Sequence, residues 1–281
     1  MPELPEVETI KNCLIPEVVG HRFTGATLLW ARMIRFPSPD EFGQRIAGQT
    51  VKSIDRRGKY LLFRLSGRDT LVLHLKMTGS LLLLPSSSAI DVHTRAVLHL
   101  DGGFDIHFRD QRKFGVMWLV EDEATVVGKL GREPLDNDFT ADLLGELLQR
   151  HSVPIKALLV DQGVIAGIGN MYADEALFAA GIHPLRMARN LSNEEVGRLH
   201  HSVRQVLTAA IGYGGASVST YQQPSGETGN AQFYFKVAHR RGQKCYRCGG
   251  SIERIVVRQR GTYFCPRCQP AGKRTSPPVR R

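Results

Sequence analysis

The chain has 281 residues, of which 42% are hydrophobic and 23% are charged. This composition is typical of a soluble globular protein, and the length favours two domains. No run approaches the roughly 20 apolar residues of a membrane span, and the N-terminus lacks the basic and apolar regions of a signal peptide. These features argue against the membrane and secreted classes and predict a cytoplasmic protein.

The formal net charge of +10 is concentrated at one end of the sequence. Residues 236–281 hold 13 Lys and Arg side chains against one acid, a net of +12, whereas the first 235 residues carry a net of −2. Positive charge localised in this way favours a polyanionic partner such as nucleic acid. A solvated, disordered tail would explain the positive charge of the final residues alone, AGKRTSPPVRR.

The N-terminal half predicts one helix followed by a β-rich region. In ETIKNCLIPEV, Cys13 shares a helical apolar face with Val7, Ile10 and Leu14, so a buried structural thiol is expected. From residue 22 to about residue 125, short apolar runs alternate with turn signals, and DGG at 101–103 marks a hairpin. Several strands at this spacing indicate a β-sandwich or barrel.

The pattern changes to helices after Asp138. FTADLLGELLQR is amphipathic, and VPIKALLVDQ predicts a helix that starts after Pro154. MYADEALFAAG predicts a third helix, which ends at Gly181, and a fourth begins with a capping box between Ser192 and Glu195. The helical pattern ends at GYGG, and a polar stretch, ASVSTYQQPSGETGNAQ, precedes a strand-like FYFKVAH.

Four of the five cysteines form the pattern C-x2-C-x16-C-x2-C. This spacing is typical of a zinc ribbon, in which two knuckles complete a tetrahedron of thiolates and RQRG forms the turn of the hairpin between them. Disulfides are the alternative, but an intracellular chain keeps its thiols reduced, and no βαβ context favours paired redox motifs. One structural zinc ion and no organic cofactor are therefore expected, with the ligands Cys245, Cys248, Cys265 and Cys268.

Further motifs follow one another along nearly the whole chain. They are PELPEVET, RRGKYLL at 56–62, HLKMTGSL at 74–81, DQRKFG at 110–115, LGREPL at 130–135, DQGVIAGIGNMYADEALFAAGIHP at 161–184 and RQRGTYFCPRCQ. In this order they resemble the formamidopyrimidine-DNA glycosylase family of bacterial base-excision enzymes. The resemblance implies an α+β multidomain fold: an N-terminal helix with a β-sandwich at 1–130, a helix–two-turn–helix domain at 131–235 with a lesion-capping loop at 216–232, and a zinc ribbon at 236–270. The basic tail at 271–281 is unusually long for the family and is expected to be disordered.

The resemblance also implies a bifunctional enzyme. Such an enzyme removes 8-oxoguanine and formamidopyrimidines from duplex DNA and then cleaves the abasic site by β,δ-elimination through a Schiff base on Pro2. A terminal amine, with a pKa of about 7.7–8.0, is more available as free base at neutral pH than a lysine with a pKa of about 10.4. Glu3 corresponds to the general acid/base, Glu6 to a supporting carboxylate and Lys59 to the β-hairpin lysine that assists elimination. The plainer interpretation is helix-start charge for both glutamates and an exposed strand-end lysine.

Other residues correspond to the DNA contacts of the family. Met77, Arg112 and Phe114 match the triad that enters the duplex and fills the space left by a flipped base, although periodicity alone favours core packing for Met77 and Phe114. The residues expected to contact DNA, chiefly its phosphates, are His93, Arg112, Lys156, Asn170 and Arg260.

Two other interpretations stay open. An endonuclease VIII-like enzyme for oxidised pyrimidines belongs to the same family. The capping loop and the LPE motif after Pro2 favour oxidised purines as the substrates instead. A non-catalytic zinc-ribbon DNA-binding protein explains the basic C-terminus equally well, but it has no need of Pro2, Glu3 and Lys59. The motifs also depart from the usual residues at Val92 and Gln111. The expected partner is double-stranded DNA that contains oxidised bases or abasic sites, bound by a monomer in the bacterial cytoplasm and nucleoid.

Overall fold

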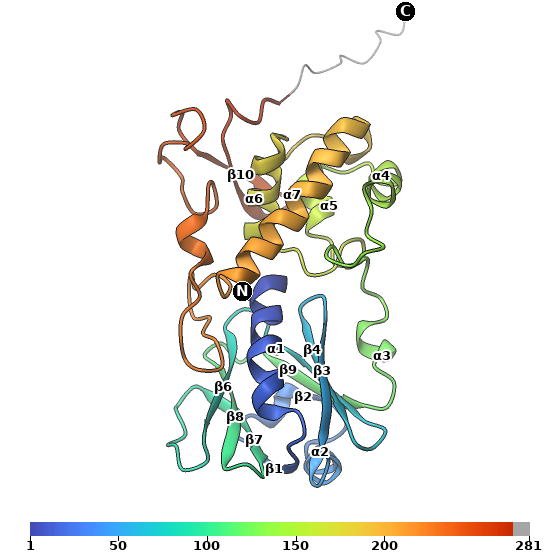
Figure 1. Cartoon of the computed structure of the whole chain (residues 1–281), viewed down its shortest axis with the longest axis vertical. Coiled ribbons are helices and arrows are strands. Elements are labelled where there is room, and N and C mark those ends of the chain that lie inside the picture. The colour runs from blue at the N-terminus through green and yellow to red at the C-terminus, as the bar shows by residue number, and fades with distance from the viewer. Residues whose placement is uncertain (272–281) are drawn as a thin grey trace, which may run out of the picture. The chain divides into compact units, whose positions relative to one another are not determined.

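The structure is a computed structural model that describes residues 1–271, so positions 272–281 of the predicted tail lie outside the described residues. The chain divides into two compact units (Figure 1). One contains residues 1–130 together with 208–233, and the other contains residues 131–207 and the chain from residue 234 onward. The predicted capping loop, residues 216–232, thus packs with the first unit. Within residues 1–271, no helix is long and apolar enough to cross a membrane.

The first unit begins with helix α1 (Leu4–Val18), which packs against strands β3 (Val51–Arg57) and β4 (Tyr60–Leu65). Its buried face repeats at helical spacing through Val7, Ile10 and Leu14, all fully buried. Cys13, predicted to be buried, is half-buried instead, because it lies at the margin of this face. The helix is followed by Gly20, whose φ of +93° suits glycine.

Two sheets form the body of this unit. All strand pairs are antiparallel except β2 with β9, which is parallel. The four-stranded sheet has the order β1 (Phe23–Leu28), β7 (Thr94–Leu100), β8 (Phe104–Asp110), β6 (Gly79–Pro85). The five-stranded sheet has the order β2 (Ile34–Phe36), β9 (Val116–Val120), β5 (Thr70–His74), β4 (Tyr60–Leu65), β3 (Val51–Arg57).

One hydrophobic cluster draws side chains from both sheets and from α1, so the sheets pack as a sandwich. The first of the predicted apolar runs, TGATLLWARMIRF at 24–36, does not form one strand, because a 3-10 turn (Ala31–Met33) separates β1 from β2. Two short helices complete the unit, α2 (Pro39–Ile46) and α3 (Ala124–Val127).

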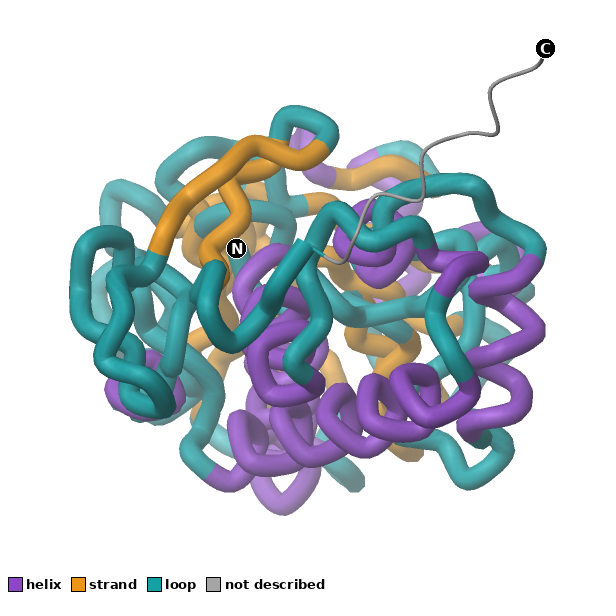
Figure 2. Tube along the Cα trace, turned by 90° about the horizontal axis from the view of Figure 1, so that it is seen from above, coloured by secondary structure: helices purple, strands orange, loops and turns teal. Residues whose placement is uncertain are grey.

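The second unit is helical and ends in a two-stranded ribbon; Figure 2 shows helices in purple and strands in orange. The predicted capping box is present, because the Ser192 hydroxyl accepts from the Glu195 N–H and the Glu195 carboxylate accepts from the Ser192 N–H. The elements are α4 (Ala141–Gln149), α5 (Ile155–Leu159), α6 (Asn170–Ala180), a 3-10 turn (Ala188–Asn190), α7 (Asn193–Gly212, whose last turns belong to the first unit), β10 (Glu253–Val257) and β11 (Arg260–Phe264).

The strand predicted for FYFKVAH does not form. A 3-10 turn (Ala231–Tyr234) begins the segment, and the backbone N–H groups of Lys236, Val237 and Ala238 all donate to the buried Glu175 carboxylate at 2.8–3.0 Å. The Glu175 carboxylate therefore accepts the backbone hydrogen bonds that, in a strand, would go to the carbonyl groups of a neighbouring strand.

Candidate functional site

The N-terminus of α1 is buried together with two carboxylates. Pro2 is buried, and Glu3 and Glu6 are 2% and 1% exposed. Glu6 Oε2 accepts from the Glu3 backbone N–H at 2.7 Å, and Glu6 Oε1 accepts from the Ala216 N–H at 2.7 Å. One side chain therefore joins the first residues of the chain to a segment 210 positions away.

The turn between β3 and β4 presents the predicted lysine. Gly58 adopts a φ of +58°, which closes the turn, and Lys59 is 5% exposed rather than solvated as the plainer interpretation held. Arg56 ties this turn to α1, because it donates to Glu8 Oε2 at 2.6 Å and to the Gly58 carbonyl at 3.0 Å. Burial raises the pKa of Glu8, but the bonds from Lys11 and Arg56 outweigh burial and hold that pKa below its ordinary value.

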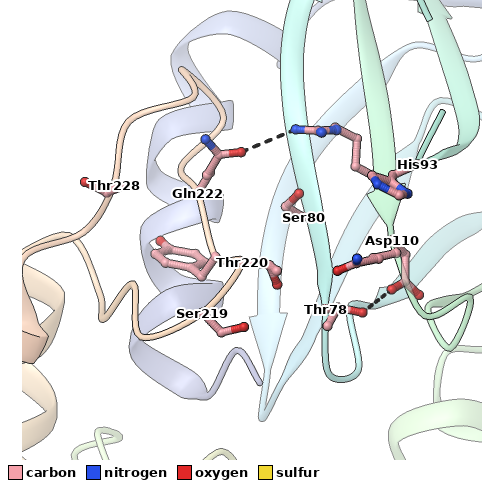
Figure 3. A pocket seen from close by; sticks show the side chains of 11 residues that line it. Thr78, Ser80, His93, Asp110, Ser219, Thr220, Gln222 and Thr228 are labelled. Carbon is pink, nitrogen blue, oxygen red and sulfur yellow. Dashed lines mark hydrogen bonds between the residues drawn. The ribbon is translucent and has the colours of Figure 1, made fainter. Parts of the chain in front are cut away.

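A cavity of about 250 Å³ lies between the four-stranded sheet and the segment that follows α7, residues 216–232, which is the predicted capping loop (Figure 3). Polar side chains line it from both sides, and Arg109 reaches across to Gln222 Oε1 at 3.4 Å. The hydrogen-bonding groups of these side chains can fix the orientation of a small ligand in this space. The lining residues are Thr78, Ser80, His93, Arg109, Asp110 and Gln111 from the sheet side, and Ser219, Thr220, Tyr221, Gln222 and Thr228 from the segment.

The segment over the cavity is held at several points. The Tyr221 hydroxyl donates to the Gly214 carbonyl at 3.2 Å, and its ring belongs to the main core. Ser217 joins the two arms of the segment, because its hydroxyl donates to the Tyr221 carbonyl and accepts from the Gly229 N–H. A Cβ at Gly229 would stand 2.2 Å from the Gly215 carbonyl oxygen, so the close approach of the arms requires glycine there.

The predicted duplex-entering triad is brought together and exposed. Met77 lies in the β5–β6 loop and is 44% exposed, whereas Phe114 lies in the β8–β9 loop and is 45% exposed. Arg112 connects them, with Nη1 3.2 Å from Met77 Sδ and its guanidinium carbon 4.6 Å from the centre of the Phe114 ring. Core packing is therefore the wrong interpretation for both apolar residues. We call these three residues the wedge.

Asp110, which the sequence did not single out, organises both wedge loops. Its carboxylate is 1% exposed and accepts from the backbone N–H groups of Arg112, Phe114 and Gly115 at 2.6–3.1 Å. It also accepts from the Thr78 hydroxyl, which belongs to the other loop. The Asp that opens the DQRKFG motif was the available signal, because Asp at the start of a turn favours hydrogen bonds to the backbone N–H groups that follow it.

The second unit places Asn170 and Arg260 on neighbouring elements. Asn170 opens α6, and its Nδ2 donates to the Gly261 carbonyl in the ribbon at 2.7 Å. Arg260 is exposed and follows the predicted RQRG turn, where Arg258 and Gln259 have φ values of +44° and +64°. Both residues stay candidates for phosphate binding.

Lys156 requires a correction. It is fully buried, and its ammonium donates to the Asp174 carboxylate and to the Asn170 carbonyl, the latter at 2.7 Å. Asp174 in turn accepts from the Tyr263 N–H of the ribbon at 3.0 Å. Because the Lys156 charge is used inside the unit, we withdraw it as a phosphate contact. His93, in contrast, is half-buried and lines the cavity.

The four predicted zinc ligands meet in the ribbon. Their sulfur atoms all lie within 4.8 Å of one another, with Cys248 Sγ 3.4 Å from Cys265 Sγ and Cys245 Sγ 3.8 Å from Cys268 Sγ. A tetrahedron of thiolates about 2.3 Å from zinc has edges of about 3.8 Å. The donor set and its spacing therefore fit one structural zinc ion.

Known families and proteins match nearly all of the chain. Residues 1–117 match the formamidopyrimidine-DNA glycosylase N-terminal domain, residues 130–222 match the formamidopyrimidine-DNA glycosylase H2TH domain, and residues 242–271 match a zinc finger found in FPG and IleRS. A formamidopyrimidine-DNA glycosylase of Chloroflexus aurantiacus is 48% identical over 272 residues, which cover 96% of this chain and 98% of that protein.

Two solved structures of the Lactococcus lactis Fpg, both 34% identical to this chain, have the same fold. The complex with DNA containing an abasic site gives a TM-score of 0.89 and covers 95% of this chain and 99% of that one. The complex with DNA containing N7-benzyl-Fapy-dG gives a TM-score of 0.89 and covers 96% of this chain and 100% of that one.

The fold and the matched domains together define a DNA glycosylase that carries a zinc finger. With these domains matched along most of its length and a relative 48% identical across nearly all of it, the chain belongs to the formamidopyrimidine-DNA glycosylase family. The fold class and the enzyme class predicted from the sequence are thereby confirmed.

Proposed function

We propose that this enzyme excises oxidised purines from duplex DNA and then cleaves the strand as an abasic-site lyase. The observation that carries the proposal is the buried N-terminus, where Glu6 joins Glu3 to the segment that covers the polar cavity. This arrangement allows the groups that break bonds to respond to the base held in the cavity. The Lactococcus lactis neighbours bound to abasic and Fapy-dG DNA support the same substrate class.

Pro2 would supply the nucleophile once Met1 has been removed. Its secondary amine attacks C1′ of the sugar, the C1′–N bond breaks, and the base departs with that electron pair and takes up a proton. The C1′–O4′ bond then breaks, and O4′ takes up a proton equivalent to the one that the Pro2 nitrogen loses, which leaves a ring-opened iminium ion. This ion acidifies the C2′ proton, so successive loss of the 3′ and 5′ phosphates follows. Glu3 would transfer the protons at O4′ and C2′, and Lys59 would assist the eliminations.

The wedge and the phosphate contacts would expose the damaged base to this chemistry. Met77 and Phe114 replace the flipped base in the stack, and Arg112 pairs with the base left opposite. His93 and Asn170 would hold phosphates of the damaged strand, and Arg260 would do so from the zinc ribbon. Action on chromosomal DNA would require the enzyme to work in the bacterial cytoplasm, at the nucleoid.

Borohydride trapping on a duplex with 8-oxoguanine opposite cytosine tests the mechanism. The expected product is a covalent adduct whose intact mass shows protein without Met1. Pro2→Gly should weaken trapping and leave binding of an uncleavable abasic analogue largely intact. Fully processed protein that gives no adduct would sink the lyase mechanism. A lesion panel in which oxidised pyrimidines react fastest would instead favour the endonuclease VIII-like specificity.

A further inference from the structure

A basic and aromatic cluster lies beside the wedge on residues that the proposed reaction does not use. We define the Trp30 cluster as Trp30, Arg32, Arg35, Lys76 and Lys113. Lys113 Nζ lies 4.3 Å from the centre of the Trp30 ring, and the guanidinium carbon of Arg32 lies 5.5 Å from the same centre. The indole is partly buried against the sandwich core, so it is a fixed platform on which the two cations are held outward.

Within the described part of the chain, no acidic side chain neutralises the positive charges of this cluster. Among residues 1–271, no acidic side chain forms an ion pair with Arg32, Arg35, Lys76 or Lys113. Burial, with a smaller contribution from the charge of Arg35, lowers the pKa of Lys76 below its ordinary value. Like charges held together without a counter-ion cost folding energy, and a bound polyanion relieves that cost.

The Trp30 cluster lies at the same end of the five-stranded sheet as the wedge, to one side of it. Strand pairing places the β3–β4 turn, the β5–β6 loop, the β8–β9 loop and the start of β2 at the same end of the five-stranded sheet. Across this end of the sheet, Lys59 lies on the β3–β4 side and Arg32 and Arg35 lie on the β2 side. Met77 and Phe114 lie between them. With strands about 4.8 Å apart, the three steps from β4 to β2 span about 14 Å.

This placement assigns different DNA strands to the two flanks, an inference that rests on the proposed function. Lys59 and the N-terminus act on the damaged strand, and the wedge enters the stack between the strands. The far flank then faces the other strand. We propose that the Trp30 cluster binds backbone phosphates of the undamaged strand, opposite the lesion, and so fixes the duplex while the damaged nucleotide turns out.

The salt dependence of binding tests the proposal. The probe is a duplex with a tetrahydrofuran abasic analogue, and the variant is Arg32→Gln with Arg35→Gln. The plot of log affinity against log salt has a negative slope, and each lost phosphate contact reduces its magnitude by about 0.9. The magnitude should therefore be smaller by about 2 in the double variant. Affinity at moderate salt should fall about 10-fold. Lys113→Gln, a second and independent variant, should reduce the magnitude of the slope by about 1.

Arg68→Gln is the matched control. Arg68 is exposed and lies in the β4–β5 turn, at the opposite end of the same sheet, so its loss should leave the slope unchanged. Thermal melting of each variant establishes that it is folded. A double variant that is folded and keeps the wild-type slope would overturn the proposal.

Neutralised phosphates identify the strand. Methylphosphonates opposite the lesion on the undamaged strand should weaken binding by the wild-type protein and have little further effect on the double variant. The same groups on the damaged strand should weaken both proteins equally. An equal effect of undamaged-strand neutralisation on both proteins would contradict the assignment. Failure of the proposed chemistry would show separately, as wild-type protein that binds the duplex but gives no borohydride adduct.

Discussion

Glu6 accepts the backbone N–H of Ala216 with one carboxylate oxygen at 2.7 Å while the other oxygen accepts the N–H of Glu3, also at 2.7 Å. The side chain is 1% exposed, so neither donor has water as an alternative partner. The start of α1 and the segment over the cavity are therefore held by the same group. A disturbance of either one is transmitted to the other.

Glu6→Gln should destabilise the first unit by about 1–3 kcal/mol, because the amide has one acceptor oxygen and directs its NH₂ group at the other donor. Borohydride trapping should slow accordingly, since Glu3 loses its fixed position. Chemical denaturation and trapping rates measure the two effects. Glu17→Gln, an exposed glutamate of the same helix, is the control and should change neither. Unaltered stability in Glu6→Gln would show that the bridge is unimportant.

Asp110→Asn should disorder the wedge loops without removing any wedge residue. The carboxylate serves three backbone donors and the Thr78 hydroxyl, and an amide cannot accept from all of them. The unsatisfied donors cost about 1–3 kcal/mol, and binding of abasic duplex should weaken about 10-fold, since 1.4 kcal/mol is a factor of 10. Asp101→Asn in an exposed hairpin is the matched control. Wild-type affinity in Asp110→Asn would mean that the loops keep their shape without it.

Removal of zinc should abolish DNA binding, because the ribbon has too small a core to fold without its metal. Chelation, or Cys265→Ala, should reduce bound zinc from one equivalent to none, as measured by elemental analysis, together with loss of affinity for duplex DNA. Cys13→Ala removes the remaining thiol, which lies outside the ribbon, and should retain one equivalent. Tight binding by a zinc-free protein would contradict a structural role for the ion.

His74 should make the protein lose stability as the pH falls below about 6.5. Burial, with smaller contributions from the charges of Lys76 and Lys59, lowers the pKa of His74 to about 3. Between these two values the unfolded chain binds a proton that the folded chain does not, so stability decreases with falling pH. The slope is at most about 1.4 kcal/mol per pH unit for one proton.

His74→Asn should flatten this slope, because asparagine keeps an acceptor for the Lys76 N–H, which donates to His74 Nδ1 at 2.9 Å, but does not titrate. Denaturation measured from pH 4 to pH 7 gives the slope for each protein. His201→Asn, at an exposed position, should retain the wild-type slope. Identical slopes in wild type and His74→Asn would show that another group controls the acid sensitivity.

Much of the architecture could be predicted from the sequence because local patterns determine it. Period-two alternation marks strands, period 3.6 marks α1 and α4, and the cysteine spacing defines the ribbon. Strand order could not be predicted in this way, because alternation shows which face of a strand is buried and not which strand lies beside it. For the same reason the FYFKVAH segment was misassigned, since its true partner, Glu175, lies about 60 positions away.

The sequence by itself determined the chemistry that is available: an N-terminal proline, adjacent carboxylates, a hairpin lysine, a wedge motif and four thiols. Side-chain type is a covalent property, so it can be identified without coordinates. Only the tertiary structure decided which of these groups are available and which are occupied. It exposed Met77 and Phe114, buried Lys156 against Asp174, and joined Glu6 to Ala216 across 210 positions. Burial and long-range hydrogen bonding depend on which segments meet in space, and local sequence patterns do not record that.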